Sequence, residues 1–246
     1  MVRRWIVSAV VVACSSTVFS IAAAYAGPRA VVELFTSQGC SSCPPADQLL
    51  AEFAADPDLV PITLPIDYWD YLGWKDTLAD PRNTARQKAY SQMRGDRDVY
   101  TPQVVVNGSL HVLGSDKRAI EQAITQSHQD AMTLSVPVKL SLVNGHLTVS
   151  VPQASPDKAA DVWICGLAKA VTVAIARGEN RGKTITYHNV VRQWLNLGRW
   201  TGQAQSWTVP IRDLEHDGID EAAVLMQTGT IEKPKGMLGA AVATLH

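Results

Sequence analysis

Along the first half of the chain, short continuous hydrophobic runs alternate with segments in which hydrophobic residues recur at helical spacing. Short runs rich in valine and leucine, each long enough for one or two strands, predict strands at 29–37, 59–67 and 101–114. Helical spacing of apolar residues predicts helices between and after these runs, at 45–56, 80–93 and 115–127. Asn107-Gly108 divides the third run into a hairpin, and Ser115 is the expected N-cap of the last helix. The predicted order is therefore β–α–β–α–β–β–α.

From residue 131 onward, apolar and polar residues mostly alternate, which favours strands. Asn144-Gly145 marks another hairpin, and only 188–198 shows a weak helical period. The order of the first half is that of thioredoxin, so we expect an α/β thioredoxin-like domain followed by a mostly β, sandwich-like C-terminal domain. The expected division is a signal peptide at 1–26, a thioredoxin-like domain at 27–130 and a β-rich domain at 131–246.

The first 26 residues have the features of a secretory signal. Arg3 and Arg4 precede an uncharged apolar stretch, and Ala24-Tyr25-Ala26 fits a cleavage site for a signal peptidase. We therefore expect an exported protein, periplasmic or extracellular, with no stable membrane insertion after cleavage. A retained membrane anchor is the alternative, because the stretch is long enough to span a bilayer.

Composition and charge indicate which classes of macromolecule the protein is expected to bind. The chain is 46% hydrophobic and 18% charged, and its 22 basic and 23 acidic residues give a formal net charge of -1. A nucleic-acid-binding surface normally needs a basic surplus, so no nucleic-acid partner is expected.

The cysteines carry the candidate chemistry. Cys14 lies in the predicted signal, which leaves Cys40, Cys43 and Cys165 in the mature chain. Cys165 lies in an apolar run, where a buried and inert thiol is expected. The stretch FTSQGCSSCPPAD places Cys40 and Cys43 two residues apart in a protein expected to meet an oxidising compartment. Such a pair can be a redox dithiol, half of a metal site or a structural disulfide.

Thiol–disulfide exchange requires an attacking thiolate and a second thiol that resolves the mixed disulfide. The pair lies between a strand and a helix, so the start of the helix would favour the thiolate. Cys40, in the turn, is the expected nucleophile and Cys43 the resolving thiol. Two prolines after Cys43 delay the helix, and Asp47 adds a nearby negative charge; both limit how far the pKa of Cys40 falls.

Residues distant in sequence complete the hypothesis of a redox site. Thr101-Pro102, at the start of a predicted strand, is expected to be a cis peptide bond that shapes a groove for an extended substrate. Aromatic side chains are the expected substrate-binding residues: Tyr68, Trp69, Tyr71, Trp74 and Tyr100. For the four in the loop at 68–74, the alternative is that they cover the core or the interface with the second domain. The segment 177–188 is either a polar loop between strands or a contact to the first domain or a ligand.

The motifs also carry a family resemblance. VVELFTSQGCSSC resembles the thioredoxin active-site strand and turn, and TPQVVVNGSLHVLGSD is similar to the cis-proline hairpin of glutaredoxins. This resemblance implies a catalytic set of Cys40, Cys43, Pro102, Thr101 and Glu33, in which Glu33 would be a buried carboxylate for proton transfer. Together with IDYWDYLGWKD and GENRGKTITYHNVVR, the motifs resemble the secreted thioredoxin-like proteins grouped as domain of unknown function 1223.

The favoured function is an exported thiol–disulfide oxidoreductase that acts on protein or small thiol substrates together with a redox partner. It would need no cofactor beyond its redox-active disulfide, and no metal site is expected. One alternative is a copper(I)-binding or delivery protein that uses Cys40, Cys43 and a distant histidine such as His111. Another is a non-catalytic interaction protein in which the disulfide is structural.

Overall fold

A computed structural model of the chain describes residues 27–154, 159–214 and 218–245. The predicted signal peptide lies outside the described residues. The first half contains β1 (Ala30–Thr36), α1 (Pro44–Ala54), β2 (Leu59–Pro65), η1 (Asp70–Leu72), α2 (Pro81–Arg94), β3 (Gln103–Val106), β4 (Leu110–Leu113) and α3 (Lys117–Ser127). The second half contains β5 (Lys139–Val143), β6 (His146–Val151), β7 (Ala160–Ala174), β8 (Thr184–Trp200), β9 (Gln205–Pro210), η2 (Ile211–Asp213), β10 (Glu221–Thr230) and β11 (Lys233–Thr244). The predicted order of elements in the first half is confirmed.

The predicted fold class is wrong. The protein is mostly β: one mixed eight-stranded sheet, ordered β11-β10-β7-β8-β2-β1-β3-β4, takes strands from both halves of the chain, and β5-β6-β9 form a second sheet. The described residues contain only three α-helices, all short. It is therefore neither an α/β thioredoxin-like domain nor such a domain followed by a separate sandwich. The long strand β8 joins the two halves, because it pairs along its length with β7 and, at Val190, in parallel with Thr63 of β2.

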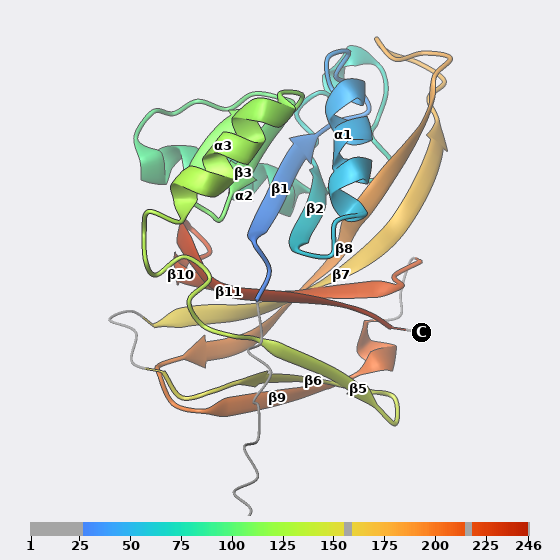
Figure 1. Cartoon of the computed structure of the whole chain (residues 1–246). Coiled ribbons are helices and arrows are strands. Elements are labelled where there is room, and N and C mark those ends of the chain that lie inside the picture. Colours follow the sequence, from blue (N-terminus) through green and yellow to red (C-terminus); the bar gives the residue numbers. More distant parts are fainter. Residues whose placement is uncertain (1–26, 155–158, 215–217, 246) are drawn as a thin grey trace, which may run out of the picture.

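The helices divide over the two faces of the large sheet (Figure 1). All seven residues of β1 are buried, and alternate side chains point to opposite faces. Val32 and Leu34 pack with apolar residues of α1 and α3, whereas Val31 and Phe35 pack with Tyr90 of α2 and with strands from the second half. A strand buried on both faces thus has a continuous apolar run in its sequence.

The small sheet covers the far half of the large one. Leu147 and Val149 of β6 pack in one core with Val162 and Ile164 of β7 and with Trp200 at the end of β8. The period of two in the sequence of β6 follows from this packing, because its alternate residues are buried while those between them are partly exposed.

Both predicted hairpin turns are confirmed. Asn107 and Gly108 join β3 to β4, and Asn144 and Gly145 join β5 to β6, all four with positive φ. The N-cap of α3 is Asp116 and not Ser115, because the carboxylate of Asp116 accepts a hydrogen bond from the amide of Ala119 at 2.9 Å.

Asn107 also links three distant elements. Its side-chain oxygen accepts a hydrogen bond from the amide of Val31 at 2.8 Å, and its side-chain nitrogen donates to Ser127 Oγ at 2.8 Å. Its carbonyl accepts from the amide of Met237 at 3.0 Å. One turn residue therefore joins the first strand, the end of α3 and the last strand.

The weak helical period at 188–198 was misleading, since this segment lies within the 17-residue strand β8.

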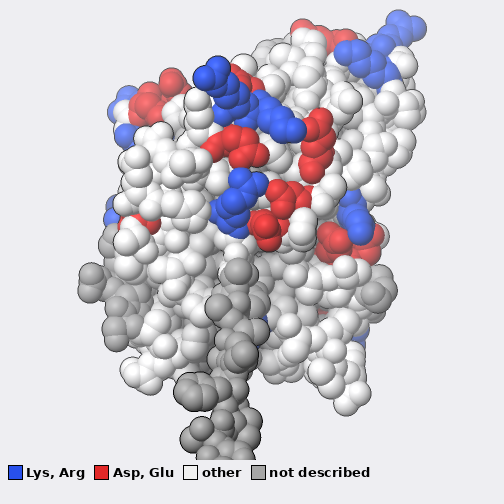
Figure 2. Space-filling model, in the orientation of Figure 1, with Lys and Arg blue, Asp and Glu red and all other residues white. Residues whose placement is uncertain are grey.

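Charges of both signs alternate over the half of the visible face that carries α1 and α3, while the half around β5, β6 and β9 is mostly uncharged among the residues described (Figure 2). Within the described residues, no helix combines the length and apolar character needed to cross a membrane.

Candidate functional site

Cys40 and Cys43 form a disulfide in the turn between β1 and α1. Their Cα atoms are 5.4 Å apart, and Cys43 is the N-cap residue of α1. Cys43 is fully buried and Cys40 is 3% exposed, while Ser41 and Ser42 between them are exposed. Both cysteines are therefore buried, Cys40 slightly less than Cys43.

The two prolines set the start of α1 one residue earlier than predicted, at Pro44. Pro44 and Pro45 have no amide hydrogen, and the next two amides, of Ala46 and Asp47, donate to the carbonyl of Cys43 at 2.8 and 3.1 Å. The first turn of the helix therefore has no free N–H group for a thiolate. The hydroxyl of Ser42, 3.4 Å from Cys40 Sγ, is the polar group that contacts this sulfur.

The Thr101–Pro102 peptide bond is cis, as predicted. Ser42 Oγ lies 3.5 Å from the carbonyl oxygen of Thr101, so this peptide borders the disulfide turn. The carbonyl of Pro102 accepts a hydrogen bond from the amide of Gly114 at 3.0 Å. A side chain at Gly114 would collide with Pro102 and Leu34, so this close approach requires glycine.

Two of the five predicted aromatic residues lie at the disulfide turn or on its border. Trp69 contacts Gly39 so closely that a side chain at Gly39 would meet it, and its indole nitrogen donates to Thr101 Oγ1 at 2.7 Å. Tyr71, 75% exposed, stacks on Trp69 with ring centroids 6.1 Å apart. An exposed aromatic surface therefore adjoins Cys40.

The other three aromatic residues have structural partners. Trp74 donates its indole hydrogen to Gln38 Oε1 at 2.8 Å, and so supports the turn from outside. The hydroxyl of Tyr68 donates to Gln87 Oε1 at 3.2 Å. The hydroxyl of Tyr100 lies 3.1 Å from Nδ1 of His111. No contact joins Tyr68 or Tyr100 directly to the disulfide turn among the described residues.

Glu33 lies on the face of β1 that α1 does not cover. Its carboxylate is fully buried and pairs with Arg86 at 2.7 Å, and it also accepts a hydrogen bond from the hydroxyl of Tyr90. Glu33 therefore belongs to a buried ion pair between β1 and α2. The structure does not bring Glu33 to the cysteines. A second buried carboxyl group is a better candidate for proton transfer with them.

That carboxyl group is Asp47, one helical turn after Cys43 on the same face of α1. The pKa of Asp47 is raised to about 8, mainly by burial and also by the charge of Asp76, although the hydrogen bond from Thr36 Oγ1 at 2.7 Å lowers it. Its Oδ2 atom is buried without a hydrogen-bond partner. At neutral pH Asp47 is therefore mostly protonated, and the nearby negative charge expected from the sequence is wrong.

The tip of the β7–β8 hairpin, residues 178–183, packs against the disulfide turn. Asn180 is fully buried and its side-chain amide donates to the carbonyl oxygens of Gln38 and Cys40, at 2.9 and 2.8 Å. Glu179 accepts a hydrogen bond from the amide of Ser41 at 3.3 Å. Of the two interpretations of this segment, the contact to the first half of the chain is confirmed. Asn180 is the residue of this polar segment that carries the contact.

Two further candidates have no part in this site. Cys165 is fully buried, and burial raises the pKa of its thiol, which fits the inert thiol expected. His111 Nε2 lies 3.2 Å from the carboxylate of Asp96, and its ring contacts Tyr100 and Gln103 rather than a cysteine. The described residues contain no group of three or more histidine, cysteine or acidic side chains arranged to hold a metal ion.

Comparisons with known proteins place these features in a family. A family model described as "Protein of unknown function (DUF1223)" matches residues 31–227. A crystal structure of a protein from Agrobacterium tumefaciens, a structural genomics target, is similar with a TM-score of 0.80 and 32% identity over 89% of this chain and 96% of that one. HBP35 of Porphyromonas gingivalis has a TM-score of 0.62 at 14% identity, over 89% of this chain and 75% of that one, which shows a shared fold alone. The search of curated proteins gave no match.

Proposed function

The chain belongs to the DUF1223 family, and we propose that it is an exported thiol–disulfide oxidoreductase that works through Cys40 and Cys43. The observation that supports this best is the disulfide itself, in a turn where exposed Ser42 contacts Cys40 Sγ and borders the Thr101–Pro102 peptide, and where Trp69 contacts the neighbouring Gly39. A disulfide that only closed a four-residue loop would add little stability, because the loop entropy it removes is small.

The proposed reaction is a two-step exchange. A substrate thiolate attacks Cys40 Sγ, the Cys40–Cys43 bond breaks, and the bonding electrons leave with Cys43 as a thiolate. A second substrate thiolate then attacks the substrate sulfur of the mixed disulfide and releases Cys40 as a thiolate. The substrate loses two electrons and forms a disulfide, and the cysteine pair gains them. The reverse sequence reduces a substrate disulfide, so the redox partner sets the direction.

Two side chains would assist these steps. The Ser42 hydroxyl, 3.4 Å from Cys40 Sγ, can donate a hydrogen bond to the thiolate and so favour it as leaving group and as nucleophile. Asp47, protonated near neutral pH and one turn from Cys43, is placed to supply a proton as the Cys43 thiolate forms and to take it back when the disulfide closes again. In this proposal Asp47 takes the role that the family resemblance suggested for Glu33.

The aromatic surface and Pro102 would bind the substrate. Tyr71 and Trp69 provide a stacked, partly exposed platform beside the disulfide turn, and the carbonyl oxygen of Thr101, which precedes Pro102, lies next to Ser42. Aromatic residues at such a position suit an extended peptide with apolar side chains.

Replacement of the resolving thiol tests the proposal. In Cys43→Ser, Cys40 has no internal partner, so a mixed disulfide with a substrate or with glutathione should persist. Mass spectrometry after incubation with oxidised glutathione should show one adduct on Cys40. Cys40→Ser/Cys43→Ser is the matched control and should show none on this segment.

The wild-type protein should also accelerate reduction of a model protein disulfide in the presence of dithiothreitol, relative to the double variant. If wild type and double variant give equal rates, and Cys40 in Cys43→Ser forms no adduct, the pair is a structural disulfide and the proposal is wrong.

A further inference from the structure

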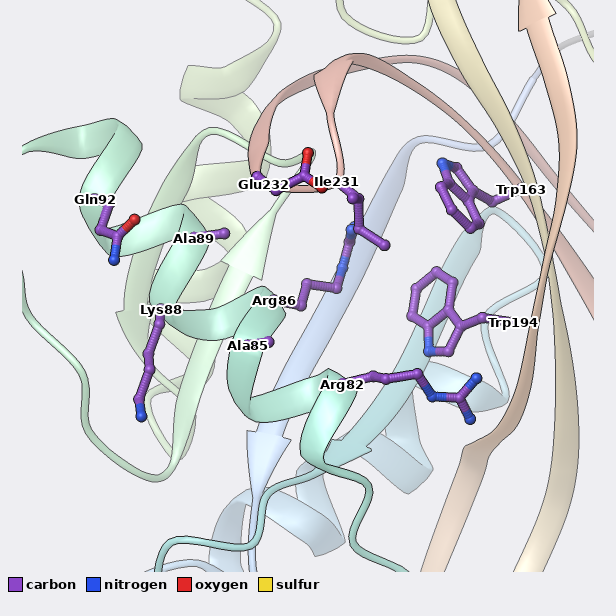
Figure 3. Close-up of a pocket in the computed structure, with 10 residues that line it drawn as sticks. All are labelled: Arg82, Ala85, Arg86, Lys88, Ala89, Gln92, Trp163, Trp194, Ile231 and Glu232. Carbon is purple, nitrogen blue, oxygen red and sulfur yellow. The ribbon is translucent and has the colours of Figure 1, made fainter.

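A cavity separates α2 from the strands β7 and β8. Its volume is about 550 Å³, which lies in the range of small-molecule sites. Figure 3 shows Trp163 and Trp194 on the strand side, one above the other, with Arg86 reaching from α2 into the space between helix and strands. Ile231, in the turn between β10 and β11, closes the cavity at one end and is 50% exposed.

The mismatch between large and small side chains creates this cavity. Cys165 pairs with Trp194 across β7 and β8, so Trp163, two residues before Cys165, lies on the same face of the sheet as Trp194. The two indole rings meet edge to face with centroids 6.3 Å apart. Opposite them, α2 presents Ala85 and Ala89, whose methyl groups do not reach the rings.

The charged side chains that line the cavity are either paired with an opposite charge or exposed to solvent. Glu232 is exposed at the mouth, where it accepts a hydrogen bond from Thr230 Oγ1 at 3.0 Å. Arg86 pairs with Glu33, and its guanidinium lies 5.0 Å from the centroid of the Trp194 ring. Arg82, at the other end, holds the carboxylate of Asp80 through two of its nitrogen atoms. Lys88 is exposed and points away from the two tryptophans (Figure 3). A charged ligand would therefore lose hydration without gaining an uncompensated partner inside the cavity.

We propose that this cavity binds a small, uncharged molecule with a planar aromatic ring. The ring lies between the edges of Trp163 and Trp194 and the alanine face of α2, where offset or edge-to-face contacts between rings are favourable. Polar groups at the mouth, the amide of Gln92 and the carboxylate of Glu232, are available to orient a hydroxyl or amine substituent.

The cavity is distinct from the disulfide site. α2 packs on the face of the sheet that α1 does not cover, and no residue that lines the cavity contacts Cys40 or Cys43. Binding is therefore independent of the proposed redox function, and the two hypotheses can fail separately.

The experiment uses N-phenylnaphthylamine, an uncharged aromatic probe whose fluorescence rises in apolar surroundings. Titration of the full-length protein should give a saturable rise in fluorescence, and Cys40→Ser/Cys43→Ser should give the same Kd. Ala85→Trp, at an exposed helical position, fills the cavity and should raise Kd about tenfold or more. Gln122→Trp adds the same side chain at an exposed position of α3, away from the cavity, and should leave Kd unchanged.

Competition identifies the ligand class. Indole, which is uncharged, should displace the probe at lower concentrations than benzoate or benzylammonium. The proposal is overturned by an absence of saturable binding, by an equal Kd in wild type and in an Ala85→Trp variant with native circular dichroism, or by displacement with benzoate or benzylammonium as effective as with indole.

Discussion

Asp47 is a buried carboxyl group one helical turn after Cys43. Its carboxyl group lies in the first turn of α1, where an exposed aspartate would be ionised and would stabilise the helix. Burial reverses this, because the charged form loses hydration and gains only the Thr36 hydroxyl as a partner. The result is a weak acid that exchanges its proton close to neutral pH.

The stability of the protein should depend on pH because of this shift in the pKa of Asp47. Between the unfolded pKa of ~3.9 and the folded pKa of about 8, the native state holds a proton on Asp47 that the unfolded state has released. The free energy of unfolding should therefore fall as pH rises through this window, and the Asp47 contribution should level off above it. Asn at this position cannot ionise, so Asp47→Asn should gain stability relative to wild type as pH rises.

Urea unfolding of wild type and Asp47→Asn at a series of pH values measures this difference. Asp98→Asn, which removes an exposed carboxylate, is the control and should keep the wild-type slope. Parallel curves for wild type and Asp47→Asn would show that Asp47 is ionised in the native state.

Among the elements, the β7–β8 hairpin packs its tip against the disulfide turn. Its tip supplies the two hydrogen bonds from Asn180 to the backbone of the disulfide turn, and Gly178, with positive φ, packs against Trp74. Cys40 is only 3% exposed in this arrangement. If the pair exchanges disulfides as proposed, we expect the hairpin tip to move before a thiol can reach Cys40.

Asn180→Ala tests this role. Loss of two hydrogen bonds, each worth ~1 kcal/mol net, should make opening easier and speed reduction of the disulfide by dithiothreitol roughly tenfold or more. The rate is followed by alkylation of Cys40 and mass spectrometry. Arg181→Ala, at an exposed neighbour in the same tip, should leave the rate unchanged. An unchanged rate in Asn180→Ala would mean that the hairpin tip does not limit access.

Elements whose signals are local were predictable from the sequence. The turns at Asn107-Gly108 and Asn144-Gly145 follow from residues that tolerate positive φ. The cysteine pair, α1 and the cis Thr101–Pro102 bond follow from the strand–turn–helix pattern. β8 could not be recognised, because it is buried in its middle and half-exposed elsewhere, so its pattern has no clean period of two. Asn180 could not be found either, since its partners lie about 140 residues away and a polar loop has the same composition.

At the scale of the whole molecule, the two halves share one core. Val31 and Phe35 of β1 pack in the same cluster as Leu225 of β10 and as Met237 and Ala240 of β11. Pairing between strands so distant in sequence leaves no local pattern, which is why the sequence predicted two successive domains and not one continuous sheet.

This shared core predicts how a truncated chain behaves. A fragment of residues 27–130 would expose the face of β1 and β2 that the second half covers, so it should unfold without a cooperative transition. Circular dichroism in urea measures this, with the chain from residue 27 to 246 as the control. A sigmoidal transition of native-like stability in the fragment would support the independent first domain expected from the sequence.

The position of Asn107 affects the order in which parts of the fold can form. A ribosome releases the chain from its N-terminus, so β1 and the turn at Asn107 emerge long before β11. The carbonyl of Asn107 pairs with the amide of Met237 in β11, far later in the sequence. The junction of first strand, turn and last strand can therefore form only after β11 has been synthesised, and until then the nascent chain lacks this edge strand of the large sheet.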